Sequence, residues 1–92
     1  MKINYTDQIL RISLNIRRVR IEKKLTIQEV AYRCNIERSN LSRIEAGKSN
    51  LTIKSICQIC NALEVSFEDI VVGQTTEDLS DNLVVAKKSQ EK

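Results

Sequence analysis

The sequence predicts an all-α domain of five short helices. Apolar residues recur at spacings of three and four along most of the chain, which is the period of an amphipathic helix. No segment alternates apolar and polar residues for long enough to indicate a strand. Ser and Thr residues precede several of the apolar stripes, where they can cap a helix N-terminus. Ninety-two residues suffice for one such domain with a single small core.

The first helix is predicted to run from about Asp7 to Lys23. Thr6 precedes it and can cap its first turn with a hydroxyl oxygen. The apolar stripe of this helix consists of Ile9, Ile12, Ile16 and Val19. We expect the stripe to be buried, while the arginines of the helix stay in solvent.

Residues 25–47, LTIQEVAYRCNIERSNLSRIEAG, predict two short helices joined by a tight turn. Thr26 can cap the first of them while Glu29 reaches back to the N–H of Thr26. Asn35 follows this helix at a position where a left-handed residue lets the chain reverse, and Gly47 closes the second helix. The apolar stripes consist of Val30, Ala31 and Cys34 in the first helix and of Leu41 and Ile44 in the second.

Two further helices and a tail are predicted beyond Gly47. Thr52 can cap a fourth helix, and Ser66 can open a short fifth helix that ends around Gly73. The residues of the fourth helix expected to face the core are Ile53, Ile56, Ile59, Cys60 and Leu63. Residues 1–73 therefore form the expected domain, and residues 74–92 a polar C-terminal tail that is either flexible or docks on a second subunit.

The second helix of the 25–47 segment has an outward face that is entirely polar. Its members are Arg38, Ser39, Asn40, Ser42 and Arg43. Guanidinium, amide and hydroxyl groups offer the donors and acceptors that read base edges in a DNA major groove. The segment thus has the layout of a DNA-binding helix-turn-helix.

From Arg17 to Ile70 the chain resembles the Cro/C1 or XRE type of helix-turn-helix repressor domain. The resemblance rests on IRRVRIEKKLT, EVA, NLSRIEAGKSNLT and NALEVSFEDI, which fall in the order and spacing of that family. It implies a five-helix lambda-repressor-like domain with the helix-turn-helix at helices 2 and 3. It also implies a transcription regulator, not an enzyme, that binds double-stranded DNA at a two-fold operator as a homodimer, without a cofactor or small-molecule ligand.

The chain departs from this family at several positions. Ile27 replaces a Gln that touches a phosphate in the family, which removes one expected backbone contact. Glu37 replaces the usual Ser cap of the recognition helix and brings a carboxylate near DNA. Lys24, Asn35 and Glu64 replace turn glycines, and Leu51 replaces a common proline. We therefore expect loops that are strained or shaped differently from those of the family.

The resemblance places Arg38, Ser39 and Arg43 at exposed positions of the recognition helix, where we expect them to read bases. An arginine can pair two N–H groups with O6 and N7 of guanine, and Asn40 can reach a base and the backbone. The alternative is that the arginines touch only phosphates, which adds affinity without sequence preference. In the family, an arginine and a glutamate at the positions of Arg20 and Glu45 often pair and fix the angle of this helix.

Contacts to the DNA backbone are expected from helix starts and the adjoining loops. Main-chain N–H groups at a helix N-terminus carry partial positive charge and can hold a phosphate. The residues assigned to phosphate binding are Thr26, Lys48, Ser49, Asn50 and Thr52. For Lys48 the alternative is a solvated loop lysine with no ligand.

The charge is unevenly distributed along the chain. Residues 11–54 hold eleven basic and four acidic residues, whereas residues 55–92 hold three basic and seven acidic. A basic half joined to an acidic half is typical of a polyanion-binding face with a solvated rear. The alternative is a merely solvated helical surface.

Three cysteines allow other interpretations. Cys57 and Cys60 form a CxxC pair, with Cys34 as a third thiol. The pair falls inside a predicted helix and not at its N-terminus, and neither a histidine nor a fourth cysteine completes a zinc site. We therefore favour a packing role over a metal site or a redox enzyme.

Two narrower functions remain open within the DNA-binding class. The SNLTIKS stretch is similar to restriction-modification controller proteins, which regulate their own operon. An antitoxin whose segment 74–92 binds a toxin is the rival. With no transmembrane run, no signal peptide and an odd number of cysteines, the chain is expected in the cytoplasm.

Overall fold

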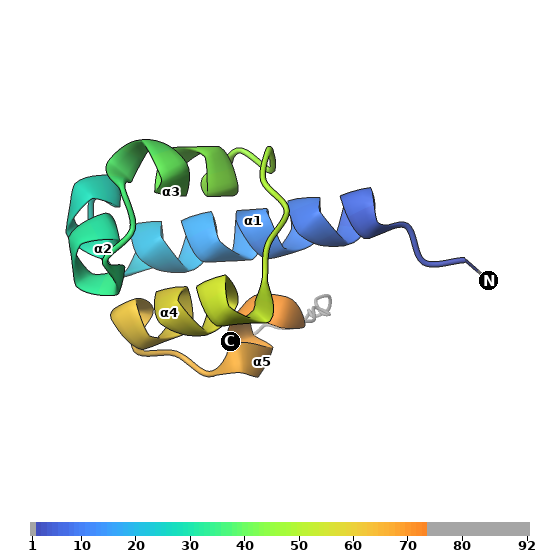
Figure 1. The fold of residues 1–92 in the computed structure, drawn as a ribbon. Helices are drawn as coiled ribbons and strands as arrows, with labels where there is room; N and C mark the ends of the chain where they lie inside the picture. Colours follow the sequence, from blue (N-terminus) through green and yellow to red (C-terminus); the bar gives the residue numbers. More distant parts are fainter. Residues whose placement is uncertain (1, 74–92) are drawn as a thin grey trace, which may run out of the picture.

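The computed structural model describes residues 2–73, which form five α-helices (Figure 1). These are α1 (Tyr5–Glu22), α2 (Ile27–Cys34), α3 (Arg38–Glu45), α4 (Ile53–Leu63) and α5 (Phe67–Val71). No strand occurs within these residues, and none of the helices here has the length and apolar character needed to cross a bilayer. The all-α class and the helix-turn-helix at α2 and α3 are confirmed. The expectations for segment 74–92 lie outside the described residues.

The long α1 runs through the middle of the domain (Figure 1). α3 lies along one side of it and α4 and α5 along the other, while α2 lies at its C-terminal end, between α3 and α4. α1 packs against α3 and α5, while α2 packs against both α3 and α4. The fully buried apolar side chains at the centre are Ile16, Val30, Leu41, Ile59, Leu63 and Ile70. All five helices contribute to this set, α5 through Ile70, so one continuous core holds α3 in place.

The predicted caps of α2, α4 and α5 are present. Thr26 Oγ1 accepts from the N–H of Glu29 at 3.0 Å, and Glu29 Oε1 accepts from the N–H of Thr26 at 2.7 Å. Thr52 caps α4 by accepting from the N–H of Ser55. Ser66 caps α5, with Asp69 completing a second capping box. These bonds satisfy N–H groups that have no partner inside the helix.

Two local predictions are wrong. α1 begins at Tyr5 rather than near Asp7, because Asn4 is its cap and accepts from the N–H of Thr6 at 2.8 Å. Ile53 was expected in the core but is 65% exposed. It is the first residue of α4, and helical side chains point back toward the N-terminus, so Ile53 extends beyond the region where α4 meets its neighbours.

Three residues stand where the family has turn glycines, and they adopt the left-handed conformation of those glycines. They are Lys24, Asn35 and Glu64, with φ of 59°, 57° and 60°. After each of them, the next N–H bonds the carbonyl five residues back, as in Leu25 N–H to Arg20. Gly47 ends α3 with the same bond, from the Lys48 N–H to the Arg43 carbonyl. The helix ends therefore keep a glycine-type geometry, and the non-glycine residues carry the strain.

Candidate nucleic-acid interface

Within residues 2–73, no other element covers the polar face of α3. Leu41, Ile44 and Glu45 are buried and attach α3 to the domain. The exposed residues are Arg38, Ser39, Asn40, Ser42 and Arg43. On a helix of 3.6 residues per turn, Ser39 and Arg43 lie in the middle of this outward face. Ser42 and Arg38 flank it on one side and Asn40 on the other, so the four residues expected to read bases do not point in one direction.

Arg20 of α1 and Glu45 of α3 are brought together in a bidentate ion pair. Arg20 Nε donates to Glu45 Oε2 at 2.7 Å, and Nη2 donates to Oε1 at 3.0 Å. The two side chains are only 12% and 5% exposed. The third nitrogen, Nη1, donates to the carbonyl of Leu25 at 2.8 Å. One guanidinium thus joins α1, the turn before α2 and the end of α3, which fixes the orientation of the helix-turn-helix.

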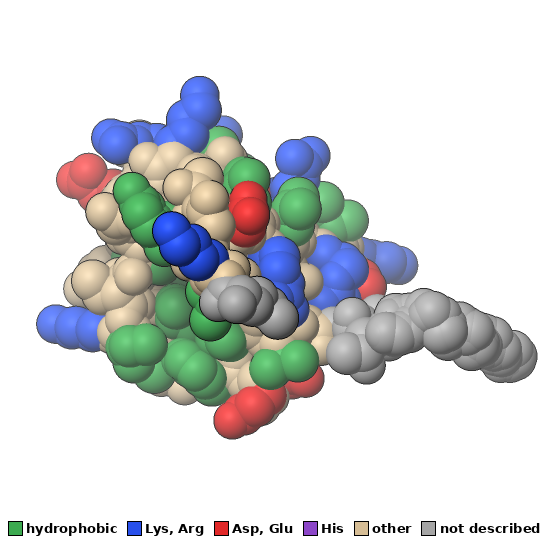
Figure 2. Space-filling model, turned by 90° about the vertical axis from the view of Figure 1, so that its right-hand side faces the viewer, with side chains coloured by type: hydrophobic (Ala, Val, Ile, Leu, Met, Phe, Trp, Pro, Cys, Tyr) green, Lys and Arg blue, Asp and Glu red, His purple; other side chains and the backbone are tan. Residues whose placement is uncertain are grey.

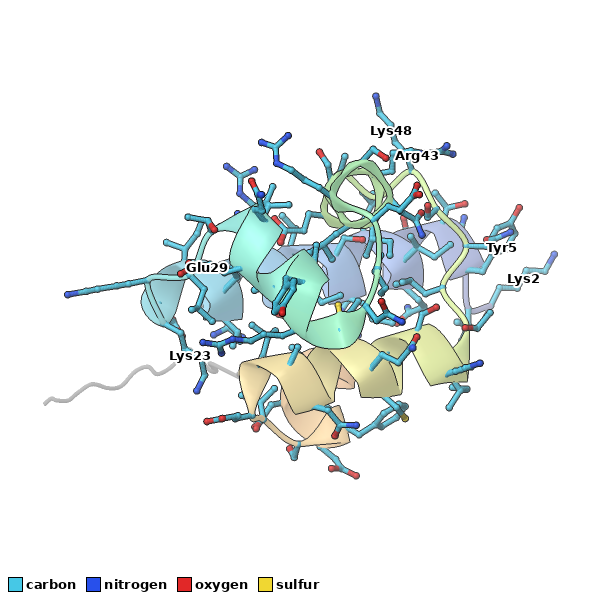
Figure 3. The ribbon with its side chains drawn as sticks, turned by 60° about the vertical axis from the view of Figure 1, so that its left-hand side comes forward. Lys2, Tyr5, Lys23, Glu29, Arg43 and Lys48 are labelled. Atoms are coloured by element: carbon cyan, nitrogen blue, oxygen red, sulfur yellow. The ribbon has the colours of Figure 1, made fainter. Side chains whose placement is uncertain are left out.

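The turn at the end of α3 places Lys48 at the same edge of the molecule as Arg43. Gly47 has φ +74°, a left-handed conformation that disfavours a side chain there. The resulting turn places Lys48 directly beyond α3, where its N–H bonds the Arg43 carbonyl at 3.0 Å. Figure 3 shows Arg43 and Lys48 projecting together at this edge, whereas Lys23 lies on the opposite side of the molecule.

The other residues assigned to phosphate binding differ in availability. The Thr26 hydroxyl accepts one bond in the capping box and can still donate to a ligand beside the N–H groups of the first turn of α2. Asn50 is exposed and Ser49 is half-buried. Thr52 is the least available, because its hydroxyl also donates to Ser55 Oγ at 3.0 Å.

Charge divides across the molecule in the face shown in Figure 2. Most side chains that project from the upper edge, where α3 lies, are Lys and Arg, and the charged side chains at the lower edge, where α5 lies, are Asp and Glu, while both kinds occur across the middle. An acidic side chain also lies near α3, since Glu37 is exposed at the start of this helix and makes no cap bond. A polyanion would therefore be attracted to the α3 edge and repelled from the α5 edge.

One basic residue near α3 was not among the sequence-based candidates. Arg17 of α1 lines a hollow beside Ser42 and Ala46. Helical spacing shows that Arg17 is on an outward face of α1, but the approach of α3 to that face depends on the tertiary packing. No motif in the local sequence identifies Arg17 as a residue close to α3.

The thiols have different environments. Cys34 and Cys60 are buried and Cys57 is exposed. Burial raises the pKa of the Cys34 and Cys60 thiols, because a thiolate is poorly solvated there. Within residues 2–73, no group of three His, Cys, Asp or Glu side chains could hold a metal ion. Buried thiols with raised pKa values are poor nucleophiles and suit core packing.

Comparison with known sequences identifies relatives. Residues 16–70 match the pattern of the family described as helix-turn-helix. The chain is also 35% identical over 60 residues to an uncharacterized HTH-type transcriptional regulator, y4dJ, of Sinorhizobium fredii. That match covers 65% of this chain and 78% of the relative.

Solved structures show the same fold. The restriction-modification controller protein C.Esp1396I, solved as a tetramer in complex with its natural 35 base-pair operator, has a TM-score of 0.66 and 37% identity. The match covers 71% of this chain and 90% of that one. The controller protein C.AhdI from Aeromonas hydrophila has a TM-score of 0.67 over 70% of this chain and 97% of its own. At 20% identity, the C.AhdI likeness supports the fold only.

Proposed function

The chain belongs to the helix-turn-helix family of the Cro/C1 type, and from that premise we propose that it is a sequence-specific DNA-binding regulator of transcription. It acts in the cytoplasm by occupying promoter DNA. Binding needs shape and charge but no catalytic group, so no cofactor is required.

The observation that carries the proposal is the presentation of α3. Its apolar residues and Glu45 are buried, while Arg38, Ser39 and Arg43 are exposed on one rigid element. Within the described residues, the guanidinium groups of Arg38 and Arg43 form neither hydrogen bonds nor ion pairs, so both are available to a ligand. Bidentate pairing of one arginine with guanine contributes about 1 to 3 kcal/mol of discrimination.

Phosphate contacts would fix α3 in the groove. Thr26 and Ile27 at the start of α2 line a hollow together with Arg38 at the start of α3, and Lys48, Ser49 and Asn50 follow the end of α3. Such contacts determine the depth and angle of the helix without reading sequence. Thr52 can join this set only by giving up its bond to Ser55.

A homodimer on a two-fold operator is part of the proposal. One α3 of eight residues contacts only a few base pairs, which gives too little affinity and specificity on its own. Two copies presenting α3 about 34 Å apart would enter successive major grooves on one side of the duplex.

Within this class, a controller protein of a restriction-modification operon is the more specific candidate. The 37% identity to C.Esp1396I over most of both chains supports it. The antitoxin alternative depends on segment 74–92, outside the described residues, and has no comparable support. Binding of the purified chain to the promoter of its own gene, with restriction and modification genes adjacent, would distinguish the two.

Replacement of Arg43 by Ala tests base reading. We expect Arg43→Ala to lower affinity for a selected DNA sequence by about 5-fold to 150-fold for each half-site of the dimer, because about 1 to 3 kcal/mol of discrimination is lost in each. Affinity for random DNA should fall much less. Fluorescence anisotropy with both DNAs at one salt concentration measures the two losses.

The matched control is Lys23→Ala, which removes a positive charge that is also exposed but lies on the opposite side of the molecule (Figure 3). It should leave both affinities nearly unchanged. Equal losses on selected and random DNA for Arg43→Ala would assign Arg43 to a phosphate and remove it from the base-reading set.

A further inference from the structure

Three arginines in the second half of α1 have different environments. Arg18 Nη1 lies 3.4 Å from Glu22 one turn later, and Arg20 is held by Glu45 and the Leu25 carbonyl. Arg17 is exposed, and its guanidinium forms no hydrogen bond or ion pair within the described residues. Of these three, only Arg17 has all its donors available to a ligand.

Arg17 lies at the rim of a hollow between α1, the start of α2 and α3. The residues lining this hollow are Arg17, Arg20, Ile27, Ser42, Glu45 and Ala46. Arg20 and Glu45 neutralise each other through two short bonds. The unbalanced charge of the hollow is therefore that of Arg17, and Ser42 adds a hydroxyl that can donate to an anion.

The hollow borders the flank of α3 and not the middle of its outward face. A helix with its side chains is about 10 to 12 Å across and fills a major groove about 12 Å wide. Its outward face and the long side chains at its N-terminal end, such as Arg38, then meet base edges, while a short side chain on a flank meets the sugar-phosphate strand that forms the groove wall. Ser42 lies on the flank that faces α1, so a strand on that side passes the hollow.

We propose that Arg17 and Ser42 bind one phosphodiester of this strand. The inference rests on the proposed DNA-binding function and adds an anchor from α1, a helix outside the helix-turn-helix. Arg17 supplies the charge and Ser42 a hydroxyl hydrogen bond. The contact holds the strand at a fixed distance from the Arg20–Glu45 pair and thereby couples the position of the DNA to the pair that orients α3.

The test measures binding of the full chain and its variants to selected and random DNA over a range of salt concentrations. Each phosphate neutralised contributes about 0.9 to the slope of log K against log salt. Because the dimer carries two copies of Arg17, Arg17→Ala should lower the slope by about 1.8 and lower affinity about 60-fold at 0.1 M salt, equally on both DNAs. Arg17→Lys should keep the slope of the wild-type chain. Ser42→Ala should lower affinity but leave the slope unchanged, because it removes a hydrogen bond and no charge.

Arg18→Ala is the matched control, because it removes the same charge one residue away, where the side chain is directed to Glu22. It should leave slope and affinity unchanged. An unchanged slope for Arg17→Ala, or a loss confined to the selected DNA, overturns the phosphate contact while the proposed function stands. Failure of the wild-type chain to bind any DNA overturns both. Thermal unfolding of Arg17→Ala should match wild type, since Arg17 is exposed.

Discussion

Replacement of Glu45 by Ala is expected to destabilise the fold by about 3 to 5 kcal/mol, because it leaves the Arg20 guanidinium buried without its partner. With side-chain exposures of 12% for Arg20 and 5% for Glu45 the pair is largely shielded from solvent, whereas an exposed pair contributes well under about 1 kcal/mol. The variant loses bonds of 2.7 and 3.0 Å and keeps only the bond from Nη1 to Leu25.

Urea unfolding followed by far-UV circular dichroism measures this loss. A small domain has a total stability of about 5 to 15 kcal/mol and an m-value of about 1 to 3 kcal/mol per M urea. The midpoint for Glu45→Ala should therefore fall by at least about 1 M. A loss below about 1 kcal/mol would refute the assignment of this pair as a buried structural contact.

The double variant Arg20→Met with Glu45→Leu separates the cost of an unpaired charge from the role of the pair. Apolar replacement of both partners of a buried pair is often neutral for stability. We expect the double variant to regain most of the stability lost in Glu45→Ala. If the pair orients α3 for DNA, its affinity for selected DNA should remain reduced although it is folded.

Two further predictions concern the helix ends. Glu64→Gly should raise the free energy of unfolding by up to about 1 kcal/mol, because relief of left-handed strain exceeds the added backbone entropy. Glu68→Gly, inside α5, should instead lower it by about 1 kcal/mol, and a loss at both sites would contradict the strain argument. The bond from the Thr26 N–H lowers the pKa of the Glu29 carboxyl below its ordinary value of 4.5. The stability that the ionised carboxylate contributes is therefore present above pH 4.5 and is lost as the pH falls through the pKa of the folded state. In Glu29→Gln this acid-dependent part should be absent, and identical stability profiles between pH 2 and pH 6 would contradict it.

Much of the fold could be predicted because its signals are local. Thr26 with Glu29 and Ser66 with Asp69 form capping boxes that can be recognised within four residues of sequence. The stripes of α2 and α3 follow directly from helical spacing. Asn35 could be assigned to a left-handed position for the same reason, since the turn between two short helices leaves few conformations.

The features that were missed depend on tertiary packing. The exposure of Ile53 follows from where α4 meets α2 and α5, which no spacing pattern contains. The position of Arg17 beside Ser42 requires the crossing of α1 and α3. The spread of Arg38, Asn40 and Arg43 around α3 likewise becomes clear only once the buried face of that helix is known.

Selection of bound sequences from a random DNA pool, repeated at two salt concentrations, tests sequence reading by a dimer of α3 helices most directly. We expect an enriched palindrome whose half-sites are centred about one helical turn apart. Binding to it should weaken steeply with salt, because several phosphates are neutralised. A pool that shows no enriched sequence at either salt concentration would contradict base reading by Arg38, Ser39 and Arg43.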